Sequence, residues 1–95
     1  MRHPFPILMN RSEVIDMAEA VRRTGRSSKT ITSYCRKHGI GRQSGAGVPI
    51  EISAPALELV MHGLWEELEL LRGGNRTDPR VRRIYDKLGI SPLEG

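Results

Sequence analysis

The residues best suited to binding chemistry are basic and lie close together in the first half of the chain. Between residues 20 and 50 there is no Asp or Glu, and the seven basic side chains are Arg22, Arg23, Arg26, Lys29, Arg36, Lys37 and Arg42. Phosphate binding needs a local positive field, and such a block supplies one whatever the net charge. A solvated basic surface has the same composition, so the choice between a phosphate-binding site and a solvated surface depends on the elements that carry these residues.

Other groupings give weaker indications of chemistry. Cys35 and His38 have a spacing that suits a metal, but no second pair of ligands accompanies them, so we expect a core or half-buried pair and no metal. Glu66, Glu67 and Glu69 point in different directions on a helix, which favours a solvated face over paired catalytic carboxylates. The glycine-rich residues 41–47 lack a Walker-type lysine, and no nucleophile is matched with a base. The sequence therefore predicts no catalytic residues, no cofactor and no enzyme.

Length and composition limit the class of protein. The chain has 95 residues, a hydrophobic fraction of 38%, a net charge of +4 and one cysteine. These values predict one small domain with a thin aliphatic core and no internal disulfide. No apolar run is long enough for a membrane span, and the apolar residues near the N-terminus are too few for a signal peptide. We therefore expect a soluble, cytoplasmic protein.

Most residues of the basic block fall on two predicted helices. Asn10 and Glu13 have the spacing of a capping box and predict the start of a first helix that ends near Gly25. Its apolar stripe is expected to consist of Val14, Met17, Ala18 and Val21. A second helix, capped by Ser27 or Ser28, has its inward stripe at Ile31, Tyr34, Cys35 and His38 and ends at Gly39. Two amphipathic helices joined by about three residues are typical of a helix-turn-helix.

The remaining segments complete the expected fold. Residues 1–9 form an irregular arm or short strand that packs Phe5, Ile7 and Leu8. Residues 48–52 alternate like a strand, with a glycine-rich hairpin tip before them, as in a wing. A third helix begins at Ser53 and breaks or kinks at Gly63, and its apolar stripe is Leu57, Val60, Met61, Leu64, Leu68 and Leu71. A last helix begins at Asp78 and Pro79, with Val81, Ile84, Tyr85 and Leu88 in register.

An ordered set of short motifs resembles a known family. The motifs are Ala-Val-Arg-Arg-Thr-Gly ending at Gly25, Arg-Ser-Ser-Lys-Thr-Ile ending at Ile31, Tyr-Cys-Arg-Lys-His-Gly-Ile ending at Ile40, a glycine-tipped wing, and Ile-Ser-Ala-Pro-Ala-Leu ending at Leu57. Together they resemble the winged helix-turn-helix of the excisionase and MerR-like group, which includes small terminase subunits of some phages. Residues from 64 onward do not match the dimerising coiled coil of MerR regulators, which favours excisionase-like or phage-type DNA binding.

The fold class expected is mainly α with a small β-hairpin wing, followed by C-terminal helices. We divide the chain into an arm (1–9), a winged helix-turn-helix domain (10–62) and a helical extension (63–95) that packs on the domain or mediates assembly. The outward face of the second helix is expected to read the edges of the DNA bases. Neighbouring basic side chains and hydroxyl groups are expected to bind the phosphates. The predicted DNA-binding residues are Arg22, Arg23, Arg26, Ser27, Ser28, Lys29, Thr30, Thr32, Ser33, Arg36, Lys37, Arg42 and Gln43. The resemblance implies that Arg42 and Gln43, at the wing tip, enter a minor groove.

The C-terminal half suggests a second surface. Leu64, Trp65 and Leu68 are candidate interface residues for self-association, and Trp65 is the candidate anchor. Its alternative role is to close the core against the last helix. The function expected is sequence-specific binding of double-stranded DNA by an excisionase-like protein or transcriptional regulator of a phage or mobile element, with no membrane partner. The alternatives are a small terminase-like packaging subunit and a protein–protein adaptor that uses the acidic, leucine-rich helix.

Overall fold

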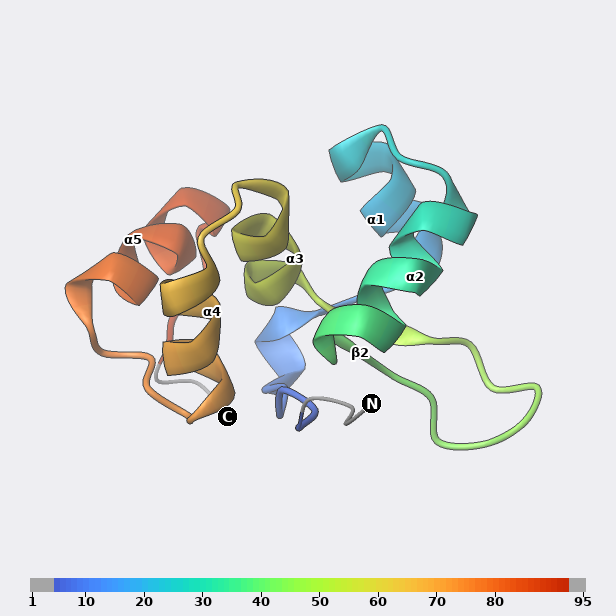
Figure 1. Cartoon of the computed structure of the whole chain (residues 1–95), viewed down its shortest axis with the longest axis horizontal. Coiled ribbons are helices and arrows are strands. Elements are labelled where there is room, and N and C mark those ends of the chain that lie inside the picture. Colours follow the sequence, from blue (N-terminus) through green and yellow to red (C-terminus); the bar gives the residue numbers. More distant parts are fainter. Residues whose placement is uncertain (1–4, 93–95) are drawn as a thin grey trace.

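The computed structural model of the chain describes residues 5–92; the first four residues of the predicted arm and the last three of the predicted extension lie outside this range. In chain order its elements are a 3-10 turn, η1 (Arg11–Glu13), β1 (Val14–Ile15), α1 (Met17–Thr24), α2 (Ser28–His38), β2 (Gly41–Arg42), β3 (Glu51–Ser53), α3 (Ala54–Met61), α4 (Trp65–Arg72) and α5 (Pro79–Leu88). α3 lies between the α1–α2 pair and the α4–α5 pair, and the β2–β3 loop extends away from the helices (Figure 1). The predicted predominance of helix is confirmed, and the small sheet has three strands.

The turn between α1 and α2 follows from the residues at its ends. Gly25 ends α1 at a φ of 69°, a left-handed conformation that glycine adopts without steric cost. Ser27 begins α2, because its hydroxyl accepts a hydrogen bond from the amide of Thr30 at 3.2 Å. The prediction of two helices joined by about three residues is confirmed.

The start of α1 differs from the prediction. The amide of Asn10 does donate a hydrogen bond to Oε1 of Glu13 at 3.0 Å, but this interaction closes only the single turn η1. The helix begins after Asp16, whose carboxylate accepts a hydrogen bond from the amide of Glu19 at 2.8 Å. The aspartate is the N-cap because its side chain can satisfy a free amide of the first turn.

The apolar face predicted for α1 is wrong at two positions. Val14 lies in β1, where it pairs with Ser53, and Ala18 is exposed. Ala20 is instead fully buried, and Met17 packs against the core. The apolar spacing of Val14 therefore belongs to a strand whose partner lies far along the chain.

The sheet places β3 in the centre, with β1 and β2 antiparallel on either side. Ile52 of β3 pairs with Ile15 on one side and Gly41 on the other, and its side chain is fully buried. The predicted strand over residues 48–52 is wrong in extent, because Val48 and Pro49 are exposed loop residues. Proline has no amide hydrogen to donate to a neighbouring strand.

Gly41 holds β2 close to α2. A Cβ atom at this position would lie 2.6 Å from Sγ of Cys35, which is closer than two such atoms approach each other. We expect Gly41→Ala to lower the free energy of unfolding by about 1–3 kcal/mol, because the strand has to move away from the helix. Denaturant unfolding measures the loss. Gly45→Ala is the control, since its Cβ would meet no atom closer than 3.8 Å, and equal stability of the two variants would contradict the close packing.

The C-terminal helices share one core with the rest of the protein. The predicted break at Gly63 is confirmed: its φ of 67° separates α3 from α4. Val81, Ile84 and Tyr85 of α5 are buried in the same apolar cluster as the residues of α2 and α3. Within residues 5–92, no helix has the length and apolar character that crossing a membrane requires.

In the described part of the N-terminal segment, Ile7 is the apolar residue whose side chain enters the core. Ile7 is 2% exposed, and its amide donates a hydrogen bond to the carbonyl oxygen of Gly39 at 3.0 Å. The prediction that Phe5 and Leu8 are packed as well is wrong, since they are 80% and 77% exposed. The segment is irregular, so successive side chains do not share one buried face.

Candidate nucleic-acid interface

α2 carries its basic residues on the side that faces away from the core. Ile31 and Cys35 are buried, as predicted for the inward face. Four residues spaced at i, i+4, i+7 and i+8 share the opposite side, and all are exposed: Lys29, Ser33, Arg36 and Lys37. We call these four residues the outer face of α2. It combines three cations with a short side chain between them.

The cations of this face have no acidic partner within the part of the chain that the structure describes. Ion pairs in that part occupy seven Lys and Arg residues: Arg22, Arg23, Arg42, Arg72, Arg76, Arg80 and Lys87. The Lys and Arg residues outside these pairs are Arg11, Arg26, Lys29, Arg36, Lys37, Arg82 and Arg83. Four of them fall between residues 26 and 37. The field of α2 is therefore available to an external anion.

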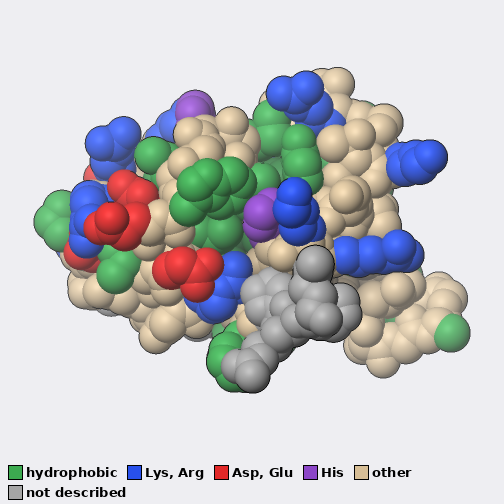
Figure 2. All heavy atoms as spheres, in the orientation of Figure 1, with side chains coloured by type: hydrophobic (Ala, Val, Ile, Leu, Met, Phe, Trp, Pro, Cys, Tyr) green, Lys and Arg blue, Asp and Glu red, His purple; other side chains and the backbone are tan. Residues whose placement is uncertain are grey.

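Figure 2 shows the same separation of charge over one side of the molecule. The charged side chains that project from the part formed by α1 and α2 are Lys and Arg, whereas Asp and Glu side chains gather over α4 and α5, with Lys and Arg side chains among them. Carboxylates of α4 pair with basic residues of α4 and α5: Glu66 pairs with Arg80, and Glu69 with Arg72. They do not neutralise the outer face of α2.

Two of the residues predicted to contact phosphate, Arg22 and Arg23, already form ion pairs with Glu19 on α1. Nε of Arg22 donates to Oε1 of Glu19 at 3.1 Å, and Nε of Arg23 donates to Oε2 at 2.7 Å. The hydrogen bonds from Arg22 and Arg23 lower the pKa of Glu19 to about 2, so this carboxylate stays ionised. The i, i+3 and i, i+4 spacing of these residues was visible in the sequence and predicts this partial neutralisation.

The predicted placement of Arg42 at a wing tip is wrong. Arg42 lies in β2, at the base of the loop, and its Nε donates to Oε1 of Glu51 in β3 at 2.8 Å. Gln43 also lies at the base, with its amide donating to the carbonyl oxygen of Val48 at 2.5 Å. The loop beyond it, residues 44–47, carries no charged side chain. The loop tip therefore has only hydroxyl and backbone groups to offer a ligand.

The predicted hydroxyl contacts are divided between helix capping and solvent. Ser27 caps the helix and also donates a hydrogen bond to Oγ1 of Thr30 at 3.0 Å. Thr32 donates to the carbonyl oxygen of Ser28 at 2.8 Å and is partly buried. Ser28 and Ser33 are exposed. Ser27 is exposed as well, but its hydroxyl is already engaged at the helix start.

Cys35 is a buried thiol behind the outer face. Burial raises its pKa from the ordinary 9.0 to about 11, so it stays protonated at neutral pH. Within residues 5–92, no three His, Cys, Asp or Glu side chains come together as a metal site would require.

We expect iodoacetamide to alkylate Cys35 at pH 8 at least about 100-fold more slowly in the folded protein than in denaturant, because the folded thiol is buried and is rarely a thiolate. Mass spectrometry of timed samples measures both rates. Equal rates would contradict the burial of the thiol.

The predicted interface residues do not share one surface. Leu68 is 1% exposed, so its assignment to an interface is wrong: it is part of the core. Trp65 is 51% exposed and does not close the core against α5. Its ring stacks on His38 at the end of α2, with a centroid separation of 5.0 Å. Arg72 adds a hydrogen bond of 2.8 Å to the carbonyl oxygen of His38, so α4 supports the end of α2.

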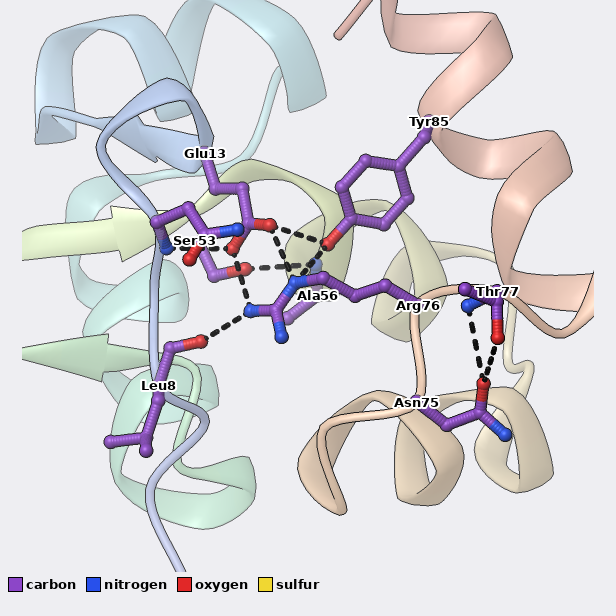
Figure 3. A network of polar contacts seen from close by, with 9 residues as sticks. Leu8, Glu13, Ser53, Ala56, Asn75, Arg76, Thr77 and Tyr85 are labelled. Carbon is purple, nitrogen blue, oxygen red and sulfur yellow. Dashed lines mark hydrogen bonds and ion pairs between the residues drawn. The ribbon is translucent and has the colours of Figure 1, made fainter. Parts of the chain in front are cut away.

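A buried polar cluster, shown in Figure 3, was missed by the sequence analysis. The carboxylate of Glu13 is fully buried, and Arg76 binds it through two hydrogen bonds of 2.7 and 3.0 Å. The hydroxyl of Tyr85 donates to the same carboxylate at 2.6 Å, and Arg76 also donates to the carbonyl oxygen of Leu8 at 2.7 Å. The cluster therefore joins η1, the α4–α5 loop and α5 next to strand β1. No local spacing in the sequence indicates it.

Comparisons of the chain with protein-family models, with curated proteins and with solved structures give no match. The functional conclusion therefore rests on the geometry and charge of the outer face of α2 and its surroundings.

Proposed function

We propose that this protein binds double-stranded DNA without catalysing a reaction, as a winged helix-turn-helix protein in which α2 is the recognition helix. The β2–β3 loop would then be the wing, with Arg42 at its base. In this proposal the protein has an architectural or regulatory role, such as excisionase-like cooperation on repeated sites or repression. The duplex is read by the outer face of α2, and Arg26 holds backbone phosphate.

The observation that carries the proposal is the exposed group of cations on α2, which have no acidic partner in residues 5–92. Lys29, Arg36 and Lys37 lie on one side of an 11-residue helix, which is about 16 Å long at 1.5 Å per residue. A helix of this size fits the major groove of B-DNA, and Arg and Lys are the commonest partners of guanine. Ser33 lies between them and is small enough to let the helix approach the bases.

The test compares binding of a labelled random duplex at 50 and 200 mM salt. We expect wild type to lose affinity steeply as salt rises, since each phosphate contact contributes about 0.9 to the logarithmic salt slope. Lys29→Ala/Arg36→Ala is expected to bind about 10- to 100-fold more weakly at 50 mM salt and to have a slope shallower by up to about 1.8.

The matched control is Arg82→Ala/Arg83→Ala, which removes the same charge from exposed residues of α5 that also lack an ion pair in the described part of the chain. The proposal predicts that this control keeps most of its affinity. If both double variants lose affinity equally, binding reflects net charge alone. If wild type does not bind duplex at 50 mM salt, the proposal is wrong.

A further inference from the structure

A second candidate binding site lies between α5 and the connection that joins α3 to α4. It is a surface hollow of about 450 Å³ lined by His62, Leu64, Arg83, Ile84 and Lys87. These residues include none of those on the outer face of α2. The volume falls in the range of small-molecule sites, which are commonly about 300–1,000 Å³.

The floor of the hollow is apolar. Ile84 is 4% exposed and belongs to the core, and Leu64 packs against that core. Gly63, at a φ of 67°, turns the chain between the two helices, and Leu64 directly after it lines the hollow together with residues of α5. An occupant therefore meets hydrocarbon at the base of the site.

The rim of the hollow is basic. Arg83 and Lys87 lie one turn apart on α5, and His62 ends α3. Glu58 partly offsets the charge of Lys87, since its carboxylate accepts a hydrogen bond from Lys87, and it also contacts Nε2 of His62 at 3.1 Å. Arg83 forms no ion pair with any described residue. The rim thus keeps one guanidinium with all its donors available for an anion.

We propose that this hollow binds a small organic anion, in which a carboxylate, sulfonate or phosphate group is attached to an apolar body. Arg83 binds the anionic group, Lys87 adds positive charge, and Leu64 and Ile84 contact the apolar body. The apolar floor distinguishes this ligand from a bare phosphate or the DNA backbone, neither of which gains from burying hydrocarbon.

The first experiment titrates the intact protein with 1-anilinonaphthalene-8-sulfonate, which combines a sulfonate with apolar rings, and follows its fluorescence. Wild type is expected to show one saturable site. Arg83→Gln is expected to weaken binding about tenfold, because it removes a charge-assisted contact. Arg82→Gln is the matched control: it removes the same charge from the neighbouring exposed residue of α5, which does not line the hollow. Equal affinity of the two variants, with folding checked by circular dichroism, overturns the proposal.

Competition separates the sources of the anion. Octanoate is expected to displace the probe at concentrations at least about tenfold lower than acetate or inorganic phosphate, because its chain is buried on the floor. Equal potency of octanoate and phosphate overturns the role of the apolar body. Displacement of the probe by a DNA duplex assigns the hollow to DNA and also overturns the proposal. Lys29→Ala/Arg36→Ala is expected to bind the probe as wild type does, so the outcome does not depend on DNA binding by α2.

Discussion

Replacing Arg76 with leucine is expected to lower the free energy of unfolding by about 3–5 kcal/mol, the usual cost of breaking a buried ion pair by removing one partner. Arg76 supplies two hydrogen bonds to the fully buried carboxylate of Glu13 and one to the carbonyl oxygen of Leu8. Leucine fills part of the space but, among the described residues, leaves that carboxylate with only Tyr85 and a backbone amide as donors. A domain of this size is typically stable by only about 5–15 kcal/mol, so the loss is a large part of the total.

Denaturant unfolding of the variant measures the loss, and Arg82→Leu serves as the matched control. Arg82 is exposed and forms no ion pair with a described residue, so its replacement is expected to change stability by less than about 0.5 kcal/mol. Glu13→Gln/Arg76→Leu is expected to recover part of the loss, because no unpaired buried charge remains. A loss below about 1 kcal/mol for Arg76→Leu would mean that the carboxylate does not depend on Arg76.

Acid is expected to weaken the same cluster. Burial raises the pKa of Glu13, but the hydrogen bonds from Arg76, Tyr85 and the amide of Asn10 lower it more, and the net pKa lies below the ordinary 4.5. A pKa lower in the folded than in the unfolded state gives stability that is fully present above the unfolded value. This contribution is lost as the pH falls below about 4.5 and through the folded pKa.

Unfolding curves of wild type and Glu13→Gln at pH 7, 5, 4 and 3 test this expectation. We expect wild type to be the more stable at pH 7, and the difference to shrink as the pH falls below 5, because the unfolded carboxylate takes up a proton first and the folded carboxylate does so only at a lower pH. Glu67→Gln is the control, since Glu67 forms no ion pair with any described residue. A constant difference between wild type and Glu13→Gln from pH 7 to pH 3 would contradict the role assigned to the ionised carboxylate.

Local sequence signals predicted the helical part of the fold well. Glycines at the ends of α1 and α2, a serine cap on α3, the start of α5 at Asp78 and Pro79 and the break at Gly63 were all expected from short-range patterns, and the structure has them. The outer face of α2 also followed from spacing alone, because an α-helix repeats every 3.6 residues. These features depend on residues within about two turns of one another, which is the range that a local pattern describes.

Contacts between distant segments were not visible in the same way. The pattern at Val14 suited a helix, but its backbone pairs with Ser53 in the sheet. Trp65 stacks on His38, which lies in another helix, and Leu68, expected at a surface, is in the core. For each of these residues, the side chain type was compatible with two environments, and the packing of the helices decided between them.

By itself the sequence determined most of the helical residues, where most of the helices end and which side of α2 is charged, since each depends on neighbours in the chain. Only the tertiary structure decided which charges on separate elements are paired with one another. Glu19 engages Arg22 and Arg23 within one helix, whereas Glu51 engages Arg42 across a sheet and Glu13 engages Arg76 from 63 residues away. An ion pair depends on distance in space, and for the last two pairs only folding brings the charges within hydrogen-bonding distance.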